Sequence, residues 1–239
     1  MSEIAALVFD VDGTLADTER DGHRVAFNRA FADARLDWDW SVELYGKLLA
    51  VTGGKERIKY YLSNFNQAFS APADLDGFVA GLHAAKTEHY KAMMAQGRIP
   101  LRPGIEALLR EARDAGVPMA IATTTTMDNV TSLLESTLGR ESIGWFAQIG
   151  AGDVVPHKKP APDIYTWVLQ RMALDGEQVI AFEDSGHGVT SAADAGIRRI
   201  LVTTNAYTLG QDFSRASLVL PSLRQADGAP VDLQFLRGL

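Results

Sequence analysis

Two aspartates, Asp10 and Asp12, stand two residues apart, directly after an apolar run near the start of the chain. Residues i and i+2 of an extended chain point to the same side, so both carboxylates are expected to face one site. Carboxylates this close repel unless a divalent cation or a shared proton relieves the repulsion, and Mg²⁺ suits such hard oxygen ligands. One carboxylate can then attack a phosphorus atom while the other transfers a proton. In the alternative, both residues only form hydrogen-bonded turns after a strand.

Three more polar stretches follow expected strands. Thr123 and Thr124 offer a hydroxyl and a backbone amide that can hold phosphate oxygens, or a threonine here only caps the next helix. Lys159, in Lys-Pro-Ala-Pro, can neutralise a phosphate or a carboxylate, or it is a solvated lysine. Glu183 and Asp184 can complete an octahedral Mg²⁺ shell, or they cap a helix.

The apolar pattern predicts strands that alternate with helices, which is typical of right-handed βαβ units and a parallel sheet. Strands are expected at residues 4–9, 117–122, 148–150, 179–182 and 199–202, with one further short strand at 218–220. Helices are expected at residues 105–115, 127–138, 162–172 and 189–195. The carboxyl ends of parallel strands meet at one edge of the sheet, so the polar stretches are expected to lie together there.

The segment after the first strand has apolar residues at helical spacing, which favours a small inserted bundle. The predicted fold class is α/β, with a Rossmann-like parallel-sheet core and an inserted helical-bundle cap. We expect the core domain to comprise residues 1–16 and 98–239, and the inserted helical domain to comprise residues 17–97.

Within the insertion, Gly53 and Gly54 precede Lys55 and Arg57. The two glycines let the backbone approach a ligand closely. Lys55 and Arg57 can hold a second anionic group, with Arg57 suited to a bidentate contact. The alternative is a flexible turn with two solvated bases, and we favour the anion-binding interpretation.

Composition excludes several classes of function. The net charge of −7 argues against a general nucleic-acid-binding surface, and the absence of cysteine excludes disulfides, thiol catalysis and cysteine zinc sites. No stretch approaches the roughly 20 apolar residues of a membrane span. The first strand begins so early that we expect no targeting peptide before it. We expect the protein to be a monomer. We expect it to lie in the cytoplasm, or in the plastid stroma if a transit peptide has been removed.

The order of these motifs resembles the haloacid dehalogenase superfamily of phosphotransferases. The resemblance rests on Asp-x-Asp-Gly-Thr-Leu from Asp10, a hydroxyl after the second strand, Lys-Pro-x-Pro and Glu-Asp-Ser. It implies a sheet domain with an inserted helical cap, of the C1 type, that closes over the site, excludes water and reads the substrate.

The resemblance also implies a role for each motif residue. Asp10 would be the nucleophile that forms an aspartyl-phosphate, and Asp12 the general acid and base. Thr123 and the amide of Thr124 would bind the transferring phosphoryl group, while Lys159 balances its charge. The Mg²⁺ ligands would be Asp10, the carbonyl of Asp12 and Asp184, with Glu183 assisting from the outer shell.

A finer resemblance concerns the run from Asp17 to Asn28 and the Gly-Gly-Lys-Glu-Arg stretch. These look like the CbbY proteins, which accompany Calvin-cycle genes and dephosphorylate xylulose-1,5-bisphosphate, an inhibitor of Rubisco. The resemblance implies a phosphorylated sugar as partner, with one phosphate at Asp10 and the other near Lys55 and Arg57. Asp17 or Glu19 can bind sugar hydroxyls, or both are solvated.

Two alternatives remain open. The wider group includes β-phosphoglucomutase, in which Asp-Ser-Glu-x-x-His follows the first motif, but here His23 comes one residue later. In an α-helix that shift turns a side chain by about 100°, so we do not transfer the mutase histidine's role to His23. A non-catalytic binding or regulatory protein is the second alternative, and the joint presence of Asp10, Asp12, Thr123, Lys159 and Asp184 argues against it.

Overall fold

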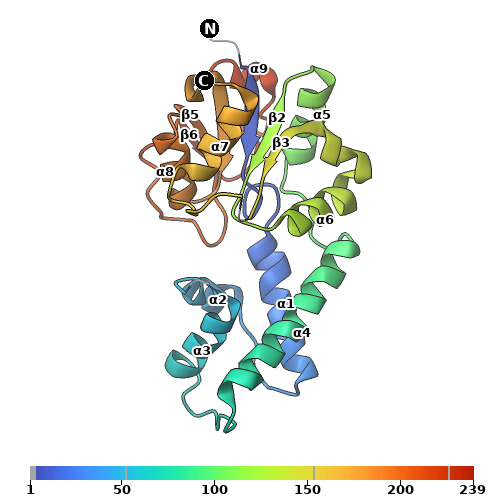
Figure 1. The fold of residues 1–239 in the computed structure, drawn as a ribbon, viewed down its shortest axis with the longest axis vertical. Helices are drawn as coiled ribbons and strands as arrows, with labels where there is room; N and C mark the ends of the chain where they lie inside the picture. Colours follow the sequence, from blue (N-terminus) through green and yellow to red (C-terminus); the bar gives the residue numbers. More distant parts are fainter. Residues whose placement is uncertain (1–3, 52, 153, 226) are drawn as a thin grey trace. The chain divides into compact units, whose positions relative to one another are not determined.

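The computed structural model describes residues 4–51, 53–152, 154–225 and 227–239 (Figure 1). Residues 1–3 of the expected core segment and Thr52, which precedes Gly53, lie outside the described residues. The chain divides into two compact units, Met1–Asp17 with Ile99–Leu239, and Thr18–Arg98. We call the first the sheet unit and the second the helical unit. The predicted α/β fold class is confirmed.

The sheet unit contains a parallel six-stranded sheet in the described part of the chain, in the order β3-β2-β1-β4-β5-β6. The strands are β1 (Ala6–Phe9), β2 (Met119–Ala122), β3 (Phe146–Gly150), β4 (Val179–Glu183), β5 (Arg199–Thr203) and β6 (Leu218–Leu220). Phe9 at the end of β1 pairs with Ile121 and Phe182, so the carboxyl ends of the three central strands are level. The side chains that follow them therefore meet at one edge.

Helices pack on the sheet and bury β1, β2, β4 and β5 completely, which explains their continuous apolar sequences (Figure 1). The elements are α5 (Ile105–Asp114), α6 (Met127–Leu138), η2 (Arg140–Trp145), α7 (Asp163–Met172), η3 (Gly176–Gln178), α8 (Gly186–Asp194) and α9 (Leu233–Leu236). Tyr165, Val168 and Leu169 of α7 share one apolar cluster with the strands. The edge strand β6 is only half-buried.

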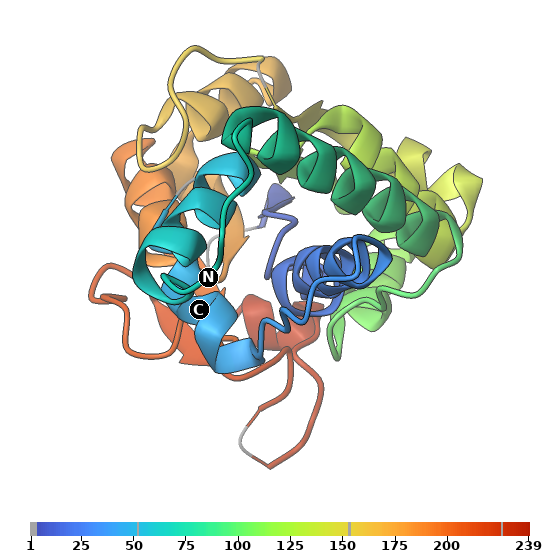
Figure 2. The ribbon, with the colours of Figure 1, turned by 90° about the horizontal axis from the view of Figure 1, so that it is seen from below.

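The helical unit is built around aromatic side chains. Its elements are η1 (Thr18–His23), α1 (Arg24–Asp33), α2 (Val42–Leu48), α3 (Gly54–Asn64) and α4 (Leu75–Ala95). α1 packs along α4 (Figure 1 and Figure 2). Trp40 is fully buried and its ring lies 4.7 Å from that of Phe27 and 4.8 Å from that of Phe31. These large buried rings form the centre of the apolar core of this unit.

The first turn of the helical unit, η1, is a π-helix rather than an α-helix. The i→i+5 bonds of a π-helix accommodate one more residue per turn than an α-helix does. The rotation by about 100° expected for His23 is therefore wrong, because it assumed α-helical geometry. Burial raises the pKa of Glu19, but attraction to His23 in its protonated form, to Arg57 and to Lys86, with a hydrogen bond from Tyr45, outweighs burial and lowers it.

His23 is held on two sides within the helical unit. Its ring stacks on Tyr90 at 4.0 Å, and its Nδ1 lies 2.8 Å from the ammonium nitrogen of the buried Lys86. Only a neutral ring can accept a hydrogen bond from that ammonium. Burial lowers the pKa of His23 to about 4; Glu19 opposes this, while Lys86 and Arg57 add to it.

Arg102 lies where the chain returns to the sheet unit. Leu101 forms an antiparallel bridge with Ala16, and the backbone amide of Arg102 donates to the Leu15 carbonyl at 2.8 Å. The segments that leave and re-enter the sheet unit therefore run side by side at this point.

The guanidinium of Arg102 is buried and connects three loops. It contacts five oxygen atoms: the carbonyls of Gly13, Thr203 (2.9 Å), Thr204 (2.6 Å) and Pro221 (3.1 Å) and the hydroxyl of Thr203 (3.0 Å). Its Nε lies 3.3 Å from Asp17 Oδ1. The turn after β1 and the loop after β5 are thus fixed to each other by one side chain.

We expect Arg102→Met to lower the free energy of unfolding by about 3 kcal/mol, because it leaves several buried carbonyls without their donor and removes the ion pair with Asp17. Urea unfolding measures the loss. Arg224→Met is the matched control, since Arg224 is exposed and its side chain, among the described residues, donates only to the Gly228 carbonyl, at 3.2 Å; we expect a change within about 0.5 kcal/mol. Equal effects of the two substitutions would contradict the assignment.

The lowered pKa of His23 predicts a pH-dependent stability. The His23 ring binds a proton near pH 6.5 in the unfolded chain but only near pH 4 in the folded chain. The contribution of the neutral ring to the free energy of unfolding is therefore fully present above pH 6.5 and is lost as the pH falls from 6.5 to 4. The loss is at most about 3 kcal/mol. His23→Gln, which keeps a neutral acceptor for Lys86, removes that loss.

The measurement is the difference in unfolding free energy between wild type and His23→Gln, from urea titrations at several pH values between 4 and 7. His89→Gln is the control, because His89 makes a surface pair with Asp33; we expect that pair to contribute less than about 1 kcal/mol. A wild-type to His23→Gln difference that stays constant with pH would show that the ring is not buried in its neutral form.

Candidate active site

The turn after β1 places Asp10, which is 6% exposed, at the carboxyl edge of the sheet. Gly13 has a φ of 84°, a conformation that favours glycine. A Cβ at Gly13 would collide with the carboxylate of Asp184 and the amide of Asn205. The glycine therefore lets the turn that carries Asp10 and Asp12 approach the loops after β4 and β5.

Lys159 joins two of the predicted site residues. Its ammonium nitrogen lies 2.7 Å from Asp10 Oδ1 and 2.6 Å from Glu183 Oε1. Burial alone would lower the pKa of Lys159, but attraction to Asp10 and Glu183 outweighs burial and raises it. The lysine is thus a fixed positive charge, and the alternative of a solvated side chain is wrong.

Glu183, the last residue of β4, is completely buried. Its Oε1 also accepts a hydrogen bond from the Tyr165 hydroxyl at 2.5 Å, whereas its Oε2 has no hydrogen-bond partner among the described residues. Burial raises the pKa of Glu183 to about 7, opposed by Lys159 and reinforced by Asp10. A Cβ at Gly188 would overlap with this carboxylate, so the first turn of α8 leaves room for it.

Asp184 completes a group of three buried carboxylates. Asp10, Glu183 and Asp184 each offer an oxygen atom within 4.8 Å of the others. Burial, together with repulsion from Asp10 and Glu183, raises the pKa of Asp184 well above its ordinary value. One lysine cannot balance three carboxylates, so the donor set fits a divalent cation that prefers oxygen ligands, such as Mg²⁺.

The remaining sheet-unit candidates lie as follows. Asp12 is half-buried, and its side chain does not belong to the cluster of three carboxylates formed by Asp10, Glu183 and Asp184. The prediction for Asp12 is that its main-chain carbonyl, and not its side chain, is a metal ligand. Thr123 is buried directly after β2, and its Oγ1 accepts from the Thr125 amide at 3.3 Å, while Thr124 is exposed. Thr126 caps α6 instead, so neither predicted phosphate-binding threonine is used as the helix cap.

Asp17, predicted to face sugar hydroxyls, pairs with Arg102. It is half-buried, so the alternative of a fully solvated carboxylate does not hold.

The Gly-Gly-Lys-Glu-Arg stretch begins α3 in the helical unit. Gly53 has a φ of 95°, and a Cβ at Gly54 would meet the His83 ring. Lys55 is exposed, whereas Arg57 is 9% exposed, so the two bases are not equivalent. The alternative of two solvated bases is therefore wrong for Arg57.

Arg57 belongs to a buried polar group with Tyr45 and Glu19. Its Nη1 donates to the Tyr45 hydroxyl at 2.8 Å, and that hydroxyl donates to Glu19 Oε2 at 2.6 Å. Arg57 also donates to the Val51 carbonyl at 3.4 Å.

Sequence reasoning missed three residues that contact the site motifs, namely Tyr165, Asn205 and Arg102. Asn205 follows a predicted strand, β5, as the other polar motifs do, so the same signal could have identified it. Tyr165 lies inside the helix predicted at residues 162–172, where no motif singled it out. Arg102 carried no motif at all.

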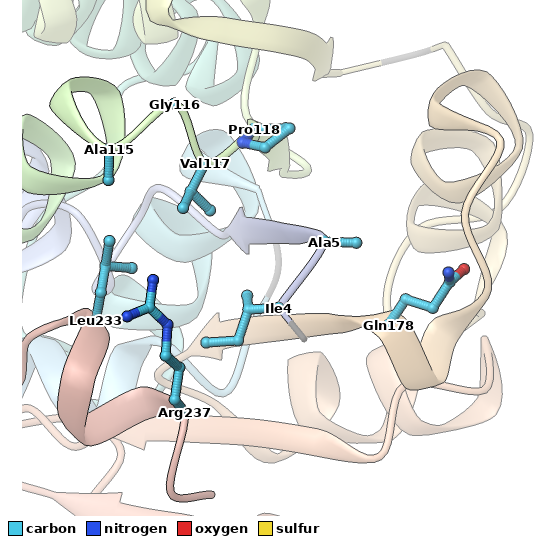
Figure 3. Close-up of a pocket in the computed structure, with 9 residues that line it drawn as sticks. All are labelled: Ile4, Ala5, Ala115, Gly116, Val117, Pro118, Gln178, Leu233 and Arg237. Carbon is cyan, nitrogen blue, oxygen red and sulfur yellow. The ribbon is translucent and has the colours of Figure 1, made fainter. Parts of the chain in front are cut away.

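A cavity of about 400 Å³ in the sheet unit lies away from this cluster (Figure 3). Its lining includes Ala5, Pro118 and Gln178, which precede β1, β2 and β4, so it opens at the amino ends of the strands. The carboxylate group lies at their carboxyl ends, where open α/β sheets bind ligands.

Among the described helices, none is both long and apolar enough to span a membrane.

Comparison with known proteins agrees with the motif order. The family model described as haloacid dehalogenase-like hydrolase matches residues 4–196. The plasmid-encoded protein CbbY of Cupriavidus necator is 46% identical over 218 residues, which cover 91% of this chain and 85% of that protein.

Solved structures give the same result. Crystal structures of CbbY from Rhodobacter sphaeroides include one with phosphate, which has a TM-score of 0.78 and covers 98% of this chain and 99% of that one. A second, of a variant with xylulose-(1,5)bisphosphate, has a TM-score of 0.75 and covers 95% and 99%. Both are 43% identical to this chain. The expected family resemblance and enzyme class are confirmed: the chain belongs to the haloacid dehalogenase-like hydrolase family and, within it, to the CbbY group.

Proposed function

We propose that this protein is a Mg²⁺-dependent phosphatase that hydrolyses xylulose-1,5-bisphosphate through an aspartyl-phosphate on Asp10. The observation that carries the proposal is the buried cluster of Asp10, Glu183 and Asp184 with the single ammonium of Lys159. The choice of sugar is supported by the related CbbY structure that contains this compound.

The reaction takes two displacements at phosphorus. In the first, a bond forms between a carboxylate oxygen of Asp10 and phosphorus as the bond to the sugar oxygen breaks, and Asp12 gives that oxygen a proton. In the second, water attacks phosphorus, Asp12 accepts its proton, and the bond to Asp10 breaks to release phosphate. Lys159 orients Asp10 and offsets negative charge at the phosphoryl group.

The threonines would hold the transferred group. Thr123 accepts a hydrogen bond from the Thr125 amide, so its hydroxyl proton can be donated to a phosphoryl oxygen. The amide of Thr124 is assigned to a second oxygen, since it comes just before the α6 cap.

The proposed Mg²⁺ ligands are Asp10, the Asp12 carbonyl and Asp184, with Glu183 in the outer shell. When bound, the ion would neutralise charge on the nucleophile and on the phosphoryl oxygens. Burial and repulsion by neighbouring carboxylates raise the pKa values of Asp184 and Glu183, and a bound divalent cation would offset both effects.

The helical unit is proposed to act as the cap. We assign the second phosphate to Arg57 and Lys55, with the glycine backbone of Gly53 and Gly54 lying close to it. The buried Arg57, fixed by Tyr45, offers a directed guanidinium rather than a mobile one. Asp17 stays our proposed contact for sugar hydroxyls, although its carboxylate already pairs with Arg102.

We expect rapid phosphate release from xylulose-1,5-bisphosphate with Mg²⁺, and slower release from ribulose-1,5-bisphosphate and β-glucose-1-phosphate. Both inorganic phosphate and the organic product are followed. Asp10→Asn should reduce the rate more than about 10⁴-fold and Asp12→Asn about 10²- to 10⁴-fold.

Asp194→Asn is the matched control, since Asp194, the last residue of α8, forms an exposed pair with Arg215. Full activity of Asp10→Asn would contradict the proposed mechanism, in which Asp10 is the nucleophile. Formation of glucose-6-phosphate from β-glucose-1-phosphate without free phosphate would instead identify a phosphomutase.

The distal-phosphate assignment predicts a selective effect of Arg57→Lys and Lys55→Met. Loss of a charged hydrogen bond of about 1.5–3 kcal/mol raises KM for the bisphosphate about 10- to 100-fold for Arg57→Lys, with little change for a sugar monophosphate. Lys59→Met is the control, because Lys59 lies on the same helix in an exposed pair with Asp76. Equal losses on both substrates would count against a second-phosphate site.

A further inference from the structure

Asp184 has a hydrogen-bond donor that the motifs did not identify. Asn205 Nδ2 donates to Asp184 Oδ2 at 2.7 Å. Asn205 lies two residues after β5, at the same edge of the sheet as Asp10 and Asp184. It is an uncharged side chain beside a carboxylate that burial already disfavours as an anion.

The orientation of the Asn205 amide is set by its other contacts. Its Oδ1 accepts a hydrogen bond from the Tyr207 amide at 2.9 Å, so the nitrogen must face Asp184. A flipped amide would place oxygen against oxygen at Asp184 and nitrogen against a backbone donor. The backbone N–H of Asn205 donates to Thr208 Oγ1 at 3.0 Å, which fixes the turn that follows.

The position of Asn205 is fixed from the other side by Arg102. The guanidinium binds the carbonyls of Thr203 and Thr204, the two residues before Asn205, and the carbonyl of Gly13. The site around Gly13 leaves no room for a Cβ between the turn and the pair of Asp184 and Asn205. Asn205 is thus packed against the turn that carries Asp10.

The charge of the donor matters. Lys159 already neutralises one side of the cluster, at Asp10 and Glu183. A second cation at Asp184 would compete with a metal ion for the same carboxylate. An amide restrains one oxygen of Asp184 while leaving its negative charge for the ion, which is how outer hydrogen bonds orient metal ligands.

We propose that Asn205 is a positioning residue that holds Asp184 in the orientation that binds the divalent cation. The inference rests on the proposed function, in which Asp184 is a Mg²⁺ ligand. Asn205 itself touches neither substrate nor the reacting atoms in this assignment.

The test is calorimetric titration of Mg²⁺ into the substrate-free full-length protein. Asn205→Ala should weaken Mg²⁺ binding about 10- to 100-fold, the usual effect of removing such a partner. Asn205→Ser is a second variant: its hydroxyl can keep the turn by accepting from the Tyr207 amide, but it is too short to reach Asp184. We expect the same loss of affinity.

Thr208→Val is the matched control, because it removes the hydroxyl that accepts from the backbone N–H of Asn205 while leaving the side-chain amide of Asn205 in place. Its Mg²⁺ affinity should stay within about twofold of wild type. The melting temperature without Mg²⁺ is measured for each variant. A purely structural role of Asn205 would lower that temperature with unchanged affinity, and this result would overturn the inference.

Asp184→Asn distinguishes failure of the Asn205 inference from failure of the proposed metal site. If wild type binds Mg²⁺ and Asp184→Asn does not, but Asn205→Ala and Asn205→Ser bind as wild type does, only the present inference fails. If wild type binds no Mg²⁺, or Asp184→Asn binds it equally well, the metal assignment of the proposed function fails and the inference fails with it.

Discussion

The ammonium of Lys159, held between Asp10 and Glu183, is the interaction on which the site depends. Three buried carboxylates within 4.8 Å of one another would otherwise repel strongly in a medium of low polarity. Lys159 lies within 2.7 Å of two of them, which removes part of that cost and leaves Asp184 to another partner. The excess of negative charge that remains favours a divalent cation. In the proposed mechanism, attraction of a metal and orientation of the nucleophile are therefore consequences of one charge balance.

That balance requires unusually close approach of backbone segments. Gly13 and Gly188 are the two places where a Cβ would overlap with a site carboxylate, Asp184 in one case and Glu183 in the other. Arg102 then fixes the turn containing Gly13 to the end of β5, mainly through carbonyl oxygens and also through the hydroxyl of Thr203. Most of the groups that it fixes are backbone atoms, so their position depends little on the side chains of those loops.

Most of the site could be predicted because it follows one topological rule. Polar residues at the carboxyl ends of parallel strands meet at one edge, so Asp10, Thr123 and Asp184 could be grouped from their places after expected strands. Tyr165 could not, since its hydroxyl acts from within an apolar helix face and its reach depends on packing. The π-helical turn before His23 was also hidden, because residue spacing alone does not tell which hydrogen-bond pattern a helix adopts.

In the helical unit, the buried side chain of interest is Arg57. Arg57 loses hydration, yet its Nε has no hydrogen-bond partner among the described residues and Glu19 Oε2 lies 3.9 Å from its Nη1. The pairing of Arg57 with the partly exposed Glu19 is therefore weak support for stability, and an apolar residue of similar volume would often be tolerated as well or better. The proposed role in anion recognition gives such a guanidinium a use, because a group held in place loses less conformational freedom on binding.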